Sequence, residues 1–283
     1  MDQLIKVFGE RNTGTRAVLA MLDAAEGVQG VAHEGVADEE LEPFEEMIRE
    51  VEAVYSGPWK RIYREAIKDI RAETLGPLGT WKHAAPLYDP AYREAGISTV
   101  FLVRNPYSWI VSLYERPYHN MGKRGGALEA FLRFPWLTVG RDNVDRILPS
   151  PMLLWPLKLR AYAAFAEAAK ADGVATATIR FEDFVQFPAQ TLNRAMGGLG
   201  LKPEGLKAFA RSTKPRGKQA DQRRSYYASE EWRADLTAPA VRIINDIVDW
   251  ELAEVYGYSR LDPASFPDVQ PISDREGRAA ATA

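Results

Sequence analysis

The sequence contains no cysteine and only three histidines. Without cysteine there is no disulfide, no thiolate metal site and no thiol nucleophile, so any catalysis must use other groups. No apolar run approaches the ~18 residues of a membrane-spanning helix. The first residues lead directly into an apolar stretch at residues 4–8 without the pattern of a signal peptide. We therefore expect a cytoplasmic protein with no membrane span.

The chain also lacks an excess of one charge. Its 36 Lys and Arg residues stand against 39 Asp and Glu residues, for a net charge of −3. Mixed charges give no overall field to attract a polyanion, so nucleic acid is not expected as a partner. Neither His33 nor His119 has a second metal-ligating neighbour at a recognisable spacing, so no metal is expected.

Short apolar runs alternate with helical patterns along the chain. The predicted strands lie at residues 4–8, 80–83, 99–103 and 174–179. The predicted helices follow Gly14, cover residues 38–74 as one or two amphipathic segments, begin at Pro106, and run from about 152 to 170. Strands separated by helices indicate a parallel sheet, so we expect an α/β fold in a single domain over residues 1–262. Residues 263–283, rich in Pro, Ser, Gly and Ala, are expected to form a loose tail.

The loop at residues 9–15 joins the first predicted strand to the first predicted helix. Main-chain N–H groups and the helix dipole can together hold an anion at such a junction. The spacing from Gly9 to Gly14 imitates the nucleotide loop G-x-x-x-x-G-K-[ST], but Thr15 stands where that loop requires lysine. ATP or GTP hydrolysis is therefore disfavoured. The alternative is an ordinary turn in which Thr13 or Thr15 caps the helix.

A second candidate anion site combines Arg104 and Ser112. Arg104 ends the strand at residues 99–103, and Ser112 lies two turns into the next predicted helix. Both can face one ligand at the carboxyl edge of the sheet, where open α/β sheets bind ligands. Alternatively, Arg104 pairs with an acid such as Glu182, and Ser112 bonds to its own helix backbone.

These two motifs resemble the sulfotransferases that use 3′-phosphoadenosine 5′-phosphosulfate (PAPS). That family places K-S-G-T after strand one and R-x-x-x-x-x-x-x-S at a later junction. Residues 12–15 (N-T-G-T) and 104–112 are similar in order and context, and a bacterial-type subgroup with E-R-N-[ST]-G-T and R-N-P-Y-S-W is closest. A looser third match comprises Arg223, Arg224, Trp232, Leu236 and Thr237.

The resemblance implies a three-layer P-loop-like fold with a mostly parallel sheet flanked by helices. It implies PAPS as donor, no metal, and a hydroxyl or amine on a small molecule or saccharide as acceptor. The implied donor-binding residues are Arg11, Asn12, Thr13, Gly14, Thr15, Arg16, Arg104, Ser112, Arg223 and Arg224. Asn12 departs from the family because it replaces the lysine of the sulfate loop. Arg11 or Arg16 is then the candidate for the missing charge.

His83 is the candidate general base, because it follows a predicted strand end and histidine can exchange a proton near neutral pH. The family's base is likewise a histidine in K-T-H-x-P, which Lys82-His83 resembles with altered spacing. Lys82 would stabilise the leaving phosphate, and Arg11 the sulfate. Alternatively, His83 is a structural histidine and Lys82 is a surface lysine.

Aromatic residues could line an acceptor pocket or fill the core. They are Trp109, Tyr114, Tyr118, Phe131, Phe134 and Trp136. Two rival functions are a P-loop-type small-molecule kinase and a nucleotide-binding protein without turnover.

Overall fold

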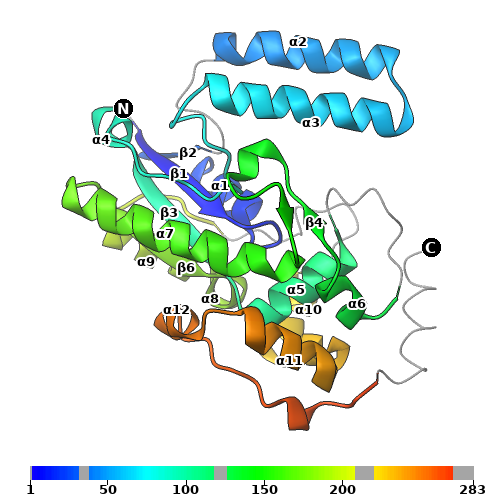
Figure 1. Ribbon diagram of the computed structural model, residues 1–283. Coiled ribbons are helices and arrows are strands. Elements are labelled where there is room, and N and C mark those ends of the chain that lie inside the picture. The colour runs from blue at the N-terminus through cyan, green and yellow to red at the C-terminus, as the bar shows by residue number, and fades with distance from the viewer. Residues whose placement is uncertain (1, 32–37, 118–125, 208–219, 270–283) are drawn as a thin grey trace.

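The computed structural model describes residues 2–31, 38–117, 126–207 and 220–269 of the chain (Figure 1). The strands are β1 (Gln3–Gly9), β2 (Val28–Val31), β3 (Ser98–Val103), β4 (Trp136–Leu137), β5 (Ile147–Leu148) and β6 (Thr176–Arg180). The helices are α1 (Thr15–Leu22), α2 (Asp38–Val54), α3 (Gly57–Thr74), α4 (Ala91–Glu94), α5 (Pro106–Glu115), α6 (Leu128–Leu132), α7 (Leu154–Ala171), α8 (Phe181–Gln186), α9 (Pro188–Gly198), α10 (Ala220–Ala228), α11 (Ala238–Ile247) and α12 (Trp250–Val255). Short 3-10 turns are η1 (Gly140–Asp142), η2 (Pro151–Leu153), η3 (Glu231–Asp235) and η4 (Pro263–Ser265).

The central sheet has four strands in the order β2-β1-β3-β6, and each adjacent pair is parallel. From β1 the chain passes through α1 to β2 on one side, and β3 then pairs with β1 on the other side. This reversal of direction creates a switch point between the carboxyl ends of β1 and β3, where Gly9 is in register with Leu102. Ligands of open α/β sheets bind at such points.

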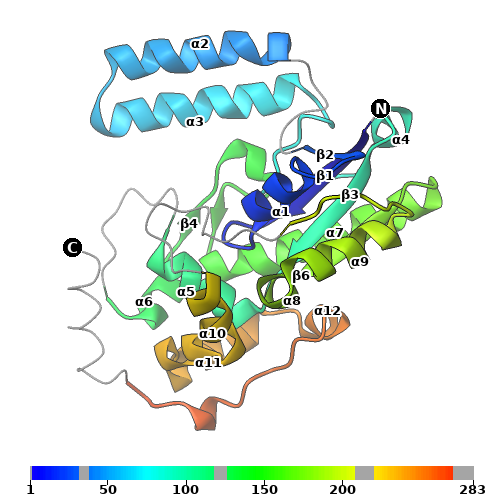
Figure 2. The same cartoon turned by 180° about the vertical axis from the view of Figure 1, so that it is seen from behind.

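Helices cover both faces of the sheet (Figures 1 and 2). On one face, Phe8 and Phe101 pack with Tyr162 and Phe165 of α7. On the other face, apolar side chains of β1 and β3 pack with α1 and α9. Strands covered on both faces need apolar residues at consecutive positions, which the runs in β1 and β3 provide. The expected three-layer α/β fold is confirmed.

Two expectations about strands need correction. Residues 80–83 form a turn instead of a strand. They contact Gly9, the last residue of β1, where Gly9 N donates to Lys82 O at 2.9 Å and His83 Nδ1 lies 2.6 Å from Gly9 O. The strand β2 was not predicted, because its four residues include Gly30 and carry little apolar pattern. A Cβ atom at Gly30 would lie 2.9 Å from the Leu19 side chain, so the glycine allows α1 to pack closely on β2.

Residues 38–74 were expected to form one or two amphipathic helices, and they form two, α2 and α3. They pack side by side beyond the end of the sheet (Figures 1 and 2). Asp69 on α3 accepts hydrogen bonds from Gly140 N at 2.7 Å, Arg141 N at 3.2 Å and Arg141 Nη1 at 2.7 Å. Arg141 also pairs with Glu65. These bonds attach α3 to η1.

The end of the described chain remains attached to the fold. Pro263–Ser265 form η4, and Ala238 N donates to Pro267 O at 2.9 Å. The remainder of the expected tail, residues 270–283, lies outside the described residues, as do His33 and His119. Within the described ranges, no helix is both long and apolar enough to cross a membrane.

We predict that Asp69→Ala destabilises the protein by about 1.5–3 kcal/mol, because it removes a charged acceptor from three N–H donors. Glu52→Ala is the matched control, since Glu52 forms exposed ion pairs with Lys60 and Arg64. Exposed pairs contribute about 0–1 kcal/mol. Urea unfolding measures both variants, and equal losses would contradict the proposed role of Asp69.

Candidate functional site

The loop after β1 presents main-chain donors at the start of α1. Gly14, with φ of 91°, is the N-cap and makes no side-chain cap bond, so neither Thr13 nor Thr15 caps the helix. Thr13 instead donates from Oγ1 to Glu10 O at 2.5 Å. Within the described residues, no acceptor is hydrogen-bonded to the N–H groups of Gly14, Thr15 or Arg16. These donors can bind an anion.

The loop has little space at its first residue. A Cβ atom at Gly9 would lie 2.6 Å from Thr13 Oγ1 and 2.9 Å from Leu102 Cβ. Gly9 therefore permits the loop to fold back against β3. Asn12 has φ of 69°, in the left-handed region that asparagine tolerates better than lysine does. This backbone angle gives a physical reason for asparagine in preference to lysine at this position.

Arg104 is buried directly beneath this loop. Its Nη1 donates to Asn12 O at 2.7 Å, and its Nη2 donates to Ser112 Oγ at 2.8 Å and Tyr227 Oη at 3.1 Å. Nε and Nη2 also bind Ser108, at 2.9 and 2.7 Å. The structure thus brings Arg104 and Ser112 into contact. Arg104 does not pair with Glu182, which accepts instead from Asn105 N and from Tyr258 Oη, each at 2.9 Å.

Arg223 and Arg224 have different surroundings on α10. Burial, together with the positive charges of Arg104 and Arg116, lowers the pKa of Arg223. In the part of the chain that the structure describes, no carboxylate forms an ion pair with Arg223. Arg224 is exposed and pairs with Asp221 at 3.2 Å. Arg223 therefore adds positive charge beside Arg104 that no described carboxylate neutralises.

His83 lies at the carboxyl end of β1, and its Nδ1 is 2.6 Å from Gly9 O. A carbonyl oxygen only accepts hydrogen bonds, so Nδ1 carries the proton in the neutral ring and Nε2 keeps a free lone pair. Burial and the positive charge of Arg11 hold the pKa of His83 well below its usual range. The ring is therefore neutral at pH 7, with the lone pair on Nε2.

The remaining predicted cations, Arg11, Lys82 and Arg16, have different surroundings. The Arg11 guanidinium lies 4.3 Å from the Trp81 ring, and the Arg141 guanidinium lies 4.4 Å from it. Lys82 is partly buried, and its positive charge also lowers the pKa of His83. Arg16 is exposed on the first turn of α1. The structure thus brings Arg11 and Lys82 near His83.

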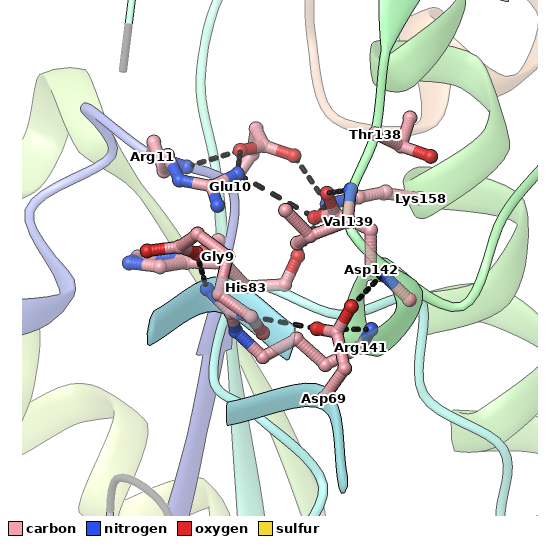
Figure 3. A network of polar contacts seen from close by, with 12 residues as sticks. Gly9, Glu10, Arg11, Asp69, His83, Thr138, Val139, Arg141, Asp142 and Lys158 are labelled. Carbon is pink, nitrogen blue, oxygen red and sulfur yellow. Dashed lines mark hydrogen bonds and ion pairs between the residues drawn. The ribbon is translucent and has the colours of Figure 1, made fainter. Parts of the chain in front are cut away.

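A buried ion cluster lies next to His83 (Figure 3). Lys158 Nζ is 2.6 Å from Glu10 Oε2 and 2.8 Å from Asp142 Oδ1, and it also donates to His83 O. Arg11 Nη1 lies 3.4 Å from Asp142 and 3.6 Å from Glu10. Burial raises the pKa of Asp142, but the charges of Lys158 and Arg11 outweigh burial and hold that pKa below its usual range. Two cations thus face two carboxylates.

Most of the aromatic residues considered for an acceptor pocket belong to the core. Trp109 and Trp136 are buried, and Trp109 Nε1 donates to Arg11 O at 3.1 Å, which supports the loop from below. Tyr114 and Phe131 pack partly buried against the same core, whereas Phe134 is exposed. Tyr118 lies outside the described residues.

The third motif also has structural contacts. Trp232 and Leu236 are buried, and Trp232 stacks on Tyr107. The Thr237 hydroxyl caps α11 by accepting from Ala240 N at 3.3 Å.

Sequence reasoning missed Lys158, Glu10 and Asp142. Lys158 had a detectable signal, because it interrupts the apolar helical face that Leu154, Leu159 and Tyr162 form on α7. A lone lysine on such a face is unusual unless it is paired. Asp142 had no such signal in the sequence, because it reaches the site from a segment far along the chain.

No protein-family model matches the chain, and no curated protein matches it in sequence. Two solved structures are similar to it. One is the sulfotransferase domain from the curacin biosynthetic pathway, with a TM-score of 0.46 and 14% identity over 92% of this chain and 99% of that one. The other is the sulfotransferase domain from the Synechococcus PCC 7002 olefin synthase, with a TM-score of 0.42 and 15% identity over 92% and 95%. At this identity neither assigns a role to a residue.

We predict that Asn12→Ala lowers the free energy of unfolding by about 1 kcal/mol, because alanine is disfavoured at positive φ. Asn12→Gly should cost little, since glycine adopts this angle without strain. Urea unfolding of both variants measures the difference. Equal losses in the two would show that a side-chain contact, and not the backbone angle, selects asparagine here.

Proposed function

We propose that this protein is a PAPS-dependent sulfotransferase. It would transfer the sulfuryl group to a hydroxyl or amine on a small molecule or saccharide, leaving adenosine 3′,5′-bisphosphate as the second product. The observation that supports this proposal is that two candidate anion sites lie together at one switch point of the sheet. Arg104 makes the connection, through its hydrogen bond to Asn12 O.

The two sites suit the two ends of a nucleotide with separate anionic groups. The free N–H groups of residues 14–16 would receive the 5′-phosphosulfate. Ser112 and Arg223 would receive the 3′-phosphate, and the buried guanidinium of Arg104 would add its positive charge beside them. ATP lacks a 3′-phosphate, so the second site favours PAPS over ATP. Thr15, at the position where nucleotide triphosphate loops require lysine, disfavours the kinase alternative for a separate reason.

His83 supplies the proton acceptor. Its Nε2 would take the proton of the acceptor hydroxyl as that oxygen attacks sulfur. The bond from sulfur to the bridging phosphate oxygen breaks, and the electron pair leaves with the 5′-phosphate. Lys82, beside His83, would offset the charge that develops on the leaving group. Because two carboxylates already neutralise Arg11, main-chain N–H groups would provide most contacts to the sulfate.

We predict that Arg223→Gln weakens binding of adenosine 3′,5′-bisphosphate by roughly 10- to 100-fold, the effect of losing about 1.5–3 kcal/mol of charge-assisted bonding. Affinity for adenosine 5′-phosphate should change little. Arg224→Gln is the matched control and should leave both affinities unaltered, because Arg224 is exposed and paired. Calorimetry measures all four constants, and equal weakening for both nucleotides would exclude a 3′-phosphate contact.

We also predict that His83→Asn lowers sulfuryl transfer by roughly 10²-fold or more, the scale of a general-base contribution. Asparagine can keep a donor toward Gly9 O but lacks Nε2, so affinity for adenosine 3′,5′-bisphosphate should persist. Turnover is measured with labelled PAPS over a panel of hydroxyl and amine acceptors. In the unaltered protein, kcat/KM should not fall through protonation of His83 between pH 8 and pH 7. The lowered pKa of His83 keeps its ring neutral in this range. Unchanged turnover in the variant would remove His83 from the mechanism.

A further inference from the structure

Lys158 is a fully buried lysine with three polar contacts, which are two hydrogen bonds and one ion pair. The ammonium group has three N–H bonds, and it contacts Glu10, Asp142 and the carbonyl oxygen of His83. The surrounding face of α7 is apolar, with Leu154 and Leu159 buried on either side. Because its side chain is fully buried and lies between two carboxylates, Lys158 is unsuited to binding a substrate anion.

The three partners of Lys158 come from three separate segments. Glu10 belongs to the loop after β1, His83 to the turn after α3, and Asp142 to η1 (Figure 3). Lys158 holds the main chain of His83 at its carbonyl, while Gly9 O holds the ring at Nδ1. The ring of His83 is therefore held by the end of β1, and its carbonyl group is held by α7.

Stability alone is a poor explanation for this cluster. Removing two ammonium or guanidinium groups and two carboxylates from water is costly, and well-packed apolar residues often replace such clusters without loss. What the cluster does contribute is a fixed geometry for the main chain of His83. A free rotation of the His83 main chain would break the Nδ1 bond and allow the other ring tautomer, in which Nε2 carries the proton and cannot accept one.

We propose that Lys158 is a positioning residue that fixes the main chain of His83 and so maintains the tautomer with a free Nε2. This inference deepens the proposed function, since it rests on His83 as the general base. In this role Lys158 does not touch the substrate, and Asp142 neutralises the charge of Lys158.

Nitrogen NMR of the imidazole rings in the full chain tests the tautomer directly. The chain has three histidines, and the imidazole signal that disappears in His83→Asn is assigned to His83. The test variant is Lys158→Met combined with Asp142→Asn, which removes one charge of each sign. We expect the two nitrogen shifts of His83 to move toward each other as the tautomers mix. We also expect kcat to fall at least ~10-fold with little change in KM for the donor.

Two controls separate positioning from general disturbance. Asp142→Asn alone keeps Lys158 on His83 O and should preserve the tautomer. Arg160 lies on the same helix as Lys158 and forms an exposed ion pair with Asp249. Arg160→Met removes this pair and should also preserve the tautomer. Unchanged His83 shifts in the folded double variant would overturn the proposal.

The outcomes distinguish this inference from the proposed function. A tautomer change in the double variant supports positioning even if no acceptor is sulfated by the unaltered protein. Should the double variant fail to fold, the unaltered protein provides the test. Its Lys158 ammonium should exchange slowly with water and show a coupling across the hydrogen bond to the His83 carbonyl carbon, and absence of that coupling would overturn the proposal.

Discussion

The site depends first on the buried guanidinium of Arg104. It binds the main chain of the loop after β1 at Asn12, the first two turns of α5 at Ser108 and Ser112, and the α10 side chain of Tyr227. A planar group with five donors can connect several segments in one fixed geometry, which a lysine could not do. Leaving its acceptors unpaired in the interior would be costly. The positions of both proposed anion sites therefore follow from this one side chain.

Around Arg104 the charges fall into two groups. Toward α10, Arg223 has no described carboxylate partner, so positive charge is available to a ligand. Toward η1, carboxylates neutralise Arg11 and Lys158. The positive φ of Asn12 is consistent with this division, because in the proposed function the loop uses main-chain donors in place of a lysine. The charge proposed to bind the ligand and the charge paired within the protein thus lie on different sides of the loop.

Much of this arrangement could be predicted from local sequence. Arg104 and Ser112 sit at a strand-to-helix junction, where their spacing alone places them on one side of the helix. Lys158 and Asp142 could not be paired in advance, because their contact depends on how a loop returns to α7 in three dimensions. Residues 80–83 were predicted as a strand from local pattern, whereas tertiary contacts fold them into the turn that carries His83. Contacts between distant segments account for these differences.

The central claim is that the two anion sites together bind a nucleotide carrying a 3′-phosphate. Calorimetric titration of the unaltered protein with adenosine 3′,5′-bisphosphate, adenosine 5′-phosphate and ATP tests it most directly. The account predicts that the bisphosphate binds at least ~10-fold more tightly than either of the others, a difference of about 1.4 kcal/mol or more. Equal or tighter binding of ATP would contradict it.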